Sequence, residues 1–179
     1  MINHVKKIDY TLFKHLPNGL AVKEYANQQN SKRKSTENMT ITVATTIDAP
    51  VESVWKFWTL PEHITQWYQA ADDWHAPYAE NDLRESGKFK TTMAAKDGSA
   101  SFDFEGIYTR IEKYKIIEYL ITDGRMVEVT FSGRGSRTKV VETFEAENIN
   151  PPELQRSGWQ AILDNFKKHS EKIVQSGKV

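Results

Sequence analysis

TIDAPVESVWKFWTLPEHITQWY, residues 46–68, is the stretch that decides the fold. It begins at the end of residues 40–47 (TITVATTI), whose β-branched and alternating pattern predicts a strand. Apolar residues then recur at helical spacing, so residues 51–59 are expected to form a helix with Asp48 as its N-cap. Pro61 ends this helix and suits the first turn of a second short one. The sequence therefore predicts a strand followed by two short helices.

The middle of the chain predicts an antiparallel meander. Asp97-Gly98 and Asp123-Gly124 are strong two-residue hairpin signals, because glycine accepts the positive φ that such turns require. Gly133-Arg134-Gly135 is a further turn, and a phosphate-binding loop is not favoured there because a β-branched run, not a helix, follows it. The strand-like runs are residues 87–95, 99–112, 115–122, 125–132 and 137–145.

The last segment predicts a long amphipathic helix. After Pro151-Pro152, one apolar stripe is formed by Trp159, Ile162, Leu163, Phe166 and Ile173. A sheet with one face to bury and a helix with one stripe to bury indicate an α+β fold, in which the sheet curls around the helix. A strongly curved sheet need not meet one helix everywhere, so an internal cavity between the two is expected, with the short helices closing one end.

The chain divides into an extension and a domain. Residues 1–38 carry seven Lys/Arg and three Asp/Glu, and residues 27–38 contain no large apolar side chain, which is typical of a linker. We therefore expect a basic, partly flexible extension at 1–38 and one folded domain at 39–179. A solvated run of charges is the favoured interpretation of Ser31–Lys34, ahead of a phosphate- or partner-binding tail.

Composition excludes several classes of function. The 24 Lys/Arg balance the 24 Asp/Glu, which argues against a nucleic-acid-binding protein. The chain has no cysteine, so disulfides, thiol nucleophiles and cysteine metal sites are excluded. No apolar run approaches the roughly 20 residues of a membrane span, and the N-terminus lacks the apolar region of a signal peptide. A cytoplasmic protein without a membrane span is expected.

No residues combine into a convincing catalytic or metal site. His63 and His75 lie near Asp72 and Asp73 without a metal-binding spacing, and residues 72–75 are interpreted as a solvated loop. No serine has the surroundings of a nucleophile, and no cofactor is expected. Asp103 and Glu105 alternate with phenylalanines and so share the opposite face of their strand, which is expected to be solvent. A bulge at Gly106 is the alternative that would turn one carboxylate inward.

Aromatic side chains are the main functional signal. Rings contributed by several elements would meet inside such a fold, either as core or as the wall of a ligand pocket. For any single residue, core packing is favoured over ligand contact. The cavity candidates are Trp58, Trp67, Trp74, Met93, Phe104, Tyr108, Phe131, Trp159, Ile162 and Phe166.

Residues 46–68 resemble the opening of the helix-grip (SRPBCC) superfamily, which includes START lipid-transfer domains and birch-pollen-allergen-type proteins. ESGKFKTTMAAKDG (85–98), FEGIYTRIEKYKIIEY (104–119) and SGWQAILDNFKKHSEK (157–172) resemble the branch named after the activator of the heat shock protein 90 ATPase. The resemblance covers about residues 40–175 and implies a helix-grip fold: a curved antiparallel sheet wrapped around a long C-terminal helix, with an internal cavity. It brings no shared catalytic motif, so the chemistry must be argued from the site itself.

Three functions follow from these expectations. The first is non-enzymatic binding of a hydrophobic or amphipathic small molecule in the cavity. The second is a co-chaperone-like role on a heat shock protein 90-type ATPase, although 38 residues are too few for the additional N-terminal domain of such an activator. Catalysis is the third and least supported, because no nucleophile or metal set is visible. Ligand identity and oligomeric state are not encoded in any recognisable motif.

Overall fold

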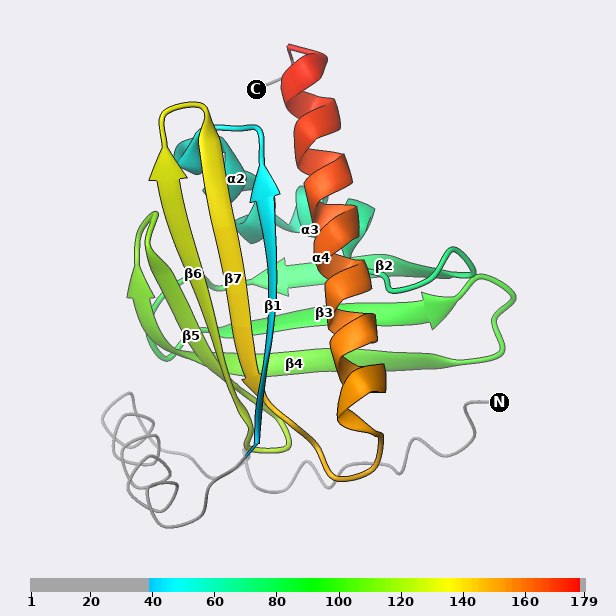
Figure 1. Ribbon diagram of the computed structural model, residues 1–179. Helices are drawn as coiled ribbons and strands as arrows, with labels where there is room; N and C mark the ends of the chain where they lie inside the picture. Colours follow the sequence, from blue (N-terminus) through cyan, green and yellow to red (C-terminus); the bar gives the residue numbers. More distant parts are fainter. Residues whose placement is uncertain (1–38, 178–179) are drawn as a thin grey trace.

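The computed structural model describes residues 39–177, and seven strands in this part form one antiparallel sheet (Figure 1). The strand order is β1-β7-β6-β5-β4-β3-β2, so every neighbour except the β1–β7 pair is joined by a direct connection along the chain. The predicted α+β helix-grip architecture is confirmed. The elements are β1 (Thr40–Ile47), α2 (Val51–Thr59), α3 (Pro61–Trp67), β2 (Trp74–Asn81), β3 (Lys88–Ala95), β4 (Ser101–Glu112), β5 (Ile116–Ile121), β6 (Met126–Arg134), β7 (Arg137–Glu145) and α4 (Pro152–Gln175).

The two short helices form where the sequence predicts them. Leu60 is extended between α2 and α3, and Pro61 occupies the start of α3, where a missing N–H costs nothing. The predicted cap was wrong, however, because Pro50 holds the N-cap position of α2 and no side chain caps it. Asp48 instead accepts a hydrogen bond from Arg137 Nε at 2.8 Å, which ties the β1–α2 turn to the start of β7.

Strand β2 is the element that the sequence analysis missed. Residues 72–75 were interpreted as a solvated loop and residues 76–81 were assigned to no element, but Trp74–Asn81 forms a strand that pairs with β3. Pro77 lies where the register shifts between His75 and Tyr78, and β2 is an edge strand of the sheet. An edge position and a bulge are the places where a strand tolerates proline, which explains the weak sequence pattern.

The sheet curls, and α4 crosses its concave side (Figure 1). The predicted stripe on α4 does face the interior, since Leu163 and Phe166 are fully buried. Trp159 stacks flat on Phe144 of β7, with ring centroids 3.9 Å apart and an interplanar angle of 14°. Helices α2 and α3 cover the rest of the concave side, beyond the reach of α4.

Side chains of α4 also hydrogen-bond the open edge of β1. The Gln160 amide both accepts from Ala44 N and donates to the Ala44 carbonyl, at 3.4 and 3.3 Å. Arg156 donates to the carbonyl of Thr42 at 2.6 Å, and Lys167 to that of Thr46 at 2.5 Å. Unpaired strand edges invite pairing with other chains, and here helix side chains satisfy the edge instead.

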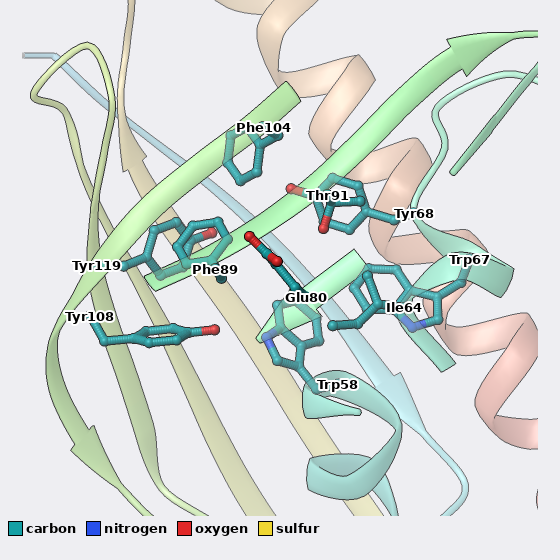
Figure 2. A pocket seen from close by; sticks show the side chains of 10 residues that line it. All are labelled: Trp58, Ile64, Trp67, Tyr68, Glu80, Phe89, Thr91, Phe104, Tyr108 and Tyr119. Atoms are coloured by element: carbon teal, nitrogen blue, oxygen red, sulfur yellow. The ribbon is translucent and has the colours of Figure 1, made fainter. Parts of the chain in front are cut away.

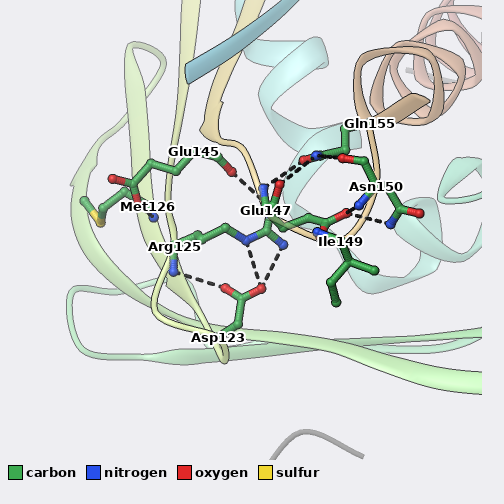
Figure 3. Close-up of polar contacts among 8 residues, drawn as sticks. All are labelled: Asp123, Arg125, Met126, Glu145, Glu147, Ile149, Asn150 and Gln155. Carbon is green, nitrogen blue, oxygen red and sulfur yellow. Dashed lines mark hydrogen bonds and ion pairs between the residues drawn. The ribbon is translucent and has the colours of Figure 1, made fainter. Parts of the chain in front are cut away.

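A polar network fixes the connection between β7 and α4 (Figure 3). The buried Gln155 accepts from Glu147 N and donates to the carbonyls of Glu147 and Asn150, with all three distances between 2.8 and 3.0 Å. The Glu147 carboxylate accepts from the backbone amides of Ile149 and Asn150, and these bonds lower its pKa against the opposing effect of burial. The first turn of α4 is therefore anchored by side chains and not by a capping residue.

Gly106 permits a close approach of an aromatic ring. A Cβ at this position would lie 2.6 Å from the Phe89 ring and 2.6 Å from the carbonyl oxygen of Leu120. The predicted alternative of a bulge here is wrong, because the pairing of β4 with both neighbours is regular at Gly106 and shifts only between Tyr108 and Arg110.

We expect Gly106→Ala to lower the free energy of unfolding by about 1–3 kcal/mol, since a Leu120 backbone atom cannot move away as a flexible side chain can. Gly158→Ala on α4 is the matched control. Its Cβ would meet nothing within 4 Å, so it should raise stability by about 0.5–1 kcal/mol through helix propensity. Urea unfolding of the two variants measures both effects, and equal stabilities would contradict the packing argument.

Candidate functional site

A pocket lies between the two short helices and strands β2–β5 (Figure 2). Its volume is about 40 Å³, room for one or two water molecules at about 30 Å³ each. The sequence analysis expected a cavity between the sheet and the C-terminal helix, but α4 contributes no side chain to this lining. In this conformation the aromatic rings therefore nearly fill the space that a ligand would need.

Four of the predicted cavity residues line this pocket. Trp58 comes from α2, Trp67 from α3, and Phe104 and Tyr108 from β4. The two tryptophan rings lie 5.2 Å apart, so both short helices present an indole to the same place.

Four further candidates form the core behind these rings. Phe166 is fully buried and contacts Trp58 and Trp67, each at 4.8 Å between ring centroids. Phe131 meets Trp58 edge-on at 5.7 Å. Trp159 and Ile162 of α4 pack against the core without reaching the pocket lining.

The remaining two candidates lie toward the far end of the sheet. Trp74 contacts Phe102, with ring centroids 5.7 Å apart, near the start of β2. Met93 is buried on the same face of β3 as Thr91 but one pair of residues further along. Neither lines the pocket, because the strands extend beyond the two short helices that close it.

Six lining residues were not among the predictions. Part of the signal was present in the strand alternation, which places every second residue of β3 on the face of Phe104. The contribution of β2 was not predictable once that strand had been missed. The six residues are Ile64, Tyr68, Glu80, Phe89, Thr91 and Tyr119.

Polar contacts hold the short helices on the sheet. The Tyr108 hydroxyl donates to Asn81 Oδ1 at 2.7 Å, and Asn81 Nδ2 donates to the Thr59 carbonyl at 2.6 Å. Trp67 Nε1 donates to the Phe57 carbonyl at 3.1 Å. The first two bonds connect β4, β2 and the end of α2, and the third orients the Trp67 indole.

Glu142 is a buried carboxyl group that the sequence analysis did not identify. It projects from β7 into the interior with an exposed fraction of 6%, and it accepts a hydrogen bond from the Tyr119 hydroxyl at 3.2 Å. Burial raises its pKa to about 8, although the Tyr119 hydrogen bond opposes this shift. Burial, with Glu142 nearby, also raises the pKa of Tyr68 and Tyr119, so both phenols stay neutral.

Two histidines meet where α3 contacts α4. His63 Nδ1 and His169 Nε2 are 3.1 Å apart, and both rings pack edge-on against Phe57. Burial is the largest cause that lowers both pKa values. Glu62 opposes the shift of His63, whereas His63 and Lys172 add to that of His169. The pair therefore favours the neutral state. Within residues 39–177, no three potential metal ligands lie close together.

Asp103 and Glu105 lie on the outer face of the sheet, as expected. Asp103 accepts from Thr92 Oγ1 at 2.6 Å and pairs with Lys90 at 2.9 Å, and these contacts lower its pKa. Glu105 lies 3.8 Å from the same lysine. The acid-base pair that an inward turn would have created is therefore absent from this part of the molecule.

No helix among residues 39–177 combines the length and the apolar character needed to cross a lipid bilayer.

Fold and site together define a helix-grip protein: a curled antiparallel sheet, a long C-terminal helix across it, and short helices that close an aromatic interior. The family model for Activator of Hsp90 ATPase homolog 1-like protein matches residues 48–171. The chain belongs to this family.

Solved structures agree with this assignment. An AHSA1-like protein from Aeromonas hydrophila is 42% identical, with 78% of this chain and 94% of that chain covered and a TM-score of 0.71. A protein from Cytophaga hutchinsonii is 51% identical over 76% and 94% of the two chains, with a TM-score of 0.65. A protein from Nitrosomonas europaea is 18% identical over 80% and 99%, with a TM-score of 0.65, and supports the fold alone. None of the curated proteins matches the chain.

Glu142 should make stability depend on pH in a defined direction. Between its ordinary pKa of 4.5 and the folded value of about 8, the folded protein keeps a proton that the unfolded chain releases. The contribution of Glu142 to the free energy of unfolding is therefore fully present below pH 4.5 and is lost as the pH rises through 8. Glu142→Gln cannot titrate, so its stability relative to the wild type should rise from pH 5 to pH 9 by a few kcal/mol, as an order of magnitude.

Urea unfolding of both proteins at pH 5, 7 and 9 measures this difference. Groups shared by the two proteins, including the histidine pair, cancel in the comparison. A constant difference across the three pH values would show that Glu142 is ionised in the folded protein.

Proposed function

We propose that this protein binds a hydrophobic or amphipathic small molecule in the aromatic pocket, without covalent chemistry. The observation that carries the proposal is the composition of the lining: aromatic rings from α2, α3 and three strands, with only a few polar groups among them. Ligand sites commonly have this character, an apolar wall with a small number of placed polar atoms.

Binding requires the pocket to widen. Small-molecule sites usually measure about 300–1,000 Å³, far more than the 40 Å³ present here. The α3 helix is the element best suited to move, because it has seven residues and is preceded by the extended Leu60. Its polar contacts with α4 are the His63–His169 pair and the Asn165 side chain on the Gln69 carbonyl just beyond it. Its apolar contact is Trp67 on Phe166, which movement of α3 would have to break. Outward movement of α3 would carry Trp67 with it and open the space above Phe104.

A second candidate is a co-chaperone-like role, which the family description favours. In that case the domain would stimulate a heat shock protein 90-type ATPase through protein contacts. The ATPase rate of the chaperone from the same cell, measured with and without the full chain, tests this role. At least a twofold increase would support it, and an unchanged rate would reject it.

Filling the pocket should abolish ligand binding. Thr91 is 4% exposed and lines the pocket, so Thr91→Met places a longer apolar side chain in the space that a ligand would use. Thr92→Met is the matched control, because its side chain lies on the opposite face and contacts Asp103. With the neutral fluorescent probe N-phenyl-1-naphthylamine, we expect saturable binding that weakens at least tenfold in the first variant only.

Native mass spectrometry of the protein purified from its own host complements this titration. A co-purifying small molecule that is lost in Thr91→Met would identify the pocket as its site. Equal probe binding by the wild type and both variants, or no saturable binding by any of them, would refute the proposal.

A further inference from the structure

Glu142 lies behind the lining of the pocket and is connected to it through the hydroxyl group of one lining residue. Tyr119, which lines the pocket, donates its hydroxyl to Glu142 Oε1 at 3.2 Å. The residues paired with Glu142 in the neighbouring strands are Val43 of β1 and Val129 of β6, both buried and apolar. The carboxyl group therefore depends on Tyr119 and on whatever enters the pocket for polar contact.

No cation of the described part of the chain neutralises this carboxyl group. Among residues 39–177, no lysine, arginine or histidine forms an ion pair with Glu142. The titratable groups that interact with it are two phenols, Tyr119 from β5 and Tyr68 from the segment after α3. A third phenol, Tyr108 from β4, interacts with these two and donates its own hydroxyl to Asn81. A buried carboxylate without a partner is costly, so a ligand that supplied a positive charge would gain a large interaction.

The aromatic walls of the pocket also favour a positively charged ligand. Seven of the ten lining side chains are aromatic, and the faces of such rings attract cations. Glu80, the charged residue of the lining, turns its carboxylate to the outer face of the sheet, where it is paired in register with Lys90 and accepts from the Tyr78 hydroxyl at 2.7 Å. A carboxylate ligand such as a fatty acid would meet negative ring faces and the Glu142 carboxyl group, and no lysine, arginine or histidine is among the lining residues.

We propose that the pocket takes an organic cation, an amphipathic amine whose apolar body packs among the rings and whose ammonium group ion-pairs with Glu142 beside Tyr119. This inference rests on the proposed function, because it names the chemical class of the ligand for the same pocket.

Binding of an amine should depend on pH in a way that distinguishes it from binding of a neutral ligand. Near neutral pH Glu142 holds a proton, because burial raises its pKa to about 8. An aliphatic amine, with a pKa of about 10, arrives already protonated. Ion-pair formation therefore releases the Glu142 proton to solvent, and affinity should rise up to tenfold per pH unit below pH 8, then level off. The facing phenols stay neutral throughout this range, so they add no slope.

Three probes with one body separate charge from hydrophobicity: 4-phenylbutylamine, 4-phenylbutanol and 4-phenylbutanoate. Isothermal titration calorimetry of the full chain between pH 6 and 9 measures all three. We expect the amine to bind at least tenfold more tightly than the alcohol at pH 8, and the carboxylate to bind most weakly. Only the amine should show a pH slope, accompanied by release of close to one proton at pH 6.5.

Glu142→Gln tests the assigned residue, since the amide keeps the shape and can still accept from Tyr119. The amine should then bind no more tightly than the alcohol, without a pH slope, while the alcohol is unaffected. Glu80→Gln is the matched control, because it removes a nearby carboxylate that lies on the outer face of the sheet, and it should keep the slope. Loss of the slope in Glu80→Gln alone would overturn the assignment to Glu142.

The outcomes separate the two proposals. Equal binding of amine and alcohol by the wild type would refute the cation proposal and leave the hydrophobic pocket intact. Failure of all three probes would refute both. Should Glu142→Gln not fold, the pH dependence of the wild-type protein with the amine and the alcohol decides the question by itself.

Discussion

One phenyl ring joins the three helices of the described domain. Phe166 of α4 contacts Trp58 of α2 and Trp67 of α3 at equal centroid distances of 4.8 Å, and the two indoles contact each other at 5.2 Å. This cluster holds the short helices against α4 and leaves the other faces of the indoles turned toward the sheet. The pocket exists on that side because α4 cannot cover the whole of a strongly curled sheet.

Much of this arrangement could be predicted from local sequence. The Asp-Gly dipeptides specify the hairpins, with Gly98 at φ +76° and Gly124 at φ +85°, and Pro61 separates the two short helices. These signals act over a few residues and need no tertiary context. Strand β2 was not predictable on the same basis, because its proline and its register shift remove the alternation that marks a strand. The division at residue 38 stays a prediction, because residues 1–38 lie outside the described residues.

The site was harder to predict than the fold, because the register of the paired strands decides which side chains point into the interior. Thr138, Val140, Glu142 and Phe144 all point inward from β7, so the alternation of that strand already placed a carboxyl group in the interior. Glutamate is nevertheless almost never fully buried unless it is paired, so the residue type alone predicted solvent exposure at position 142. A polar residue at a core position of an otherwise consistent strand marks a place where local rules give way to function. The aromatic candidates were less informative, since rings in the core and rings in the pocket share one continuous cluster.

The contacts between α4 and β1 require that the spacing of side chains along the helix matches the spacing of backbone groups along the strand. The donors and acceptors on α4 span residues 156–171, and their partners on β1 and just beyond it span residues 42–48. Fifteen helical steps of about 1.5 Å cover roughly 22 Å, and six strand steps of about 3.4 Å cover roughly 20 Å. The contacting stretch of α4 is therefore nearly as long as the stretch of β1 that it contacts at the edge of the sheet. Insertion of a single residue into this part of α4 would rotate every later side chain by about 100° and expose the strand to self-association.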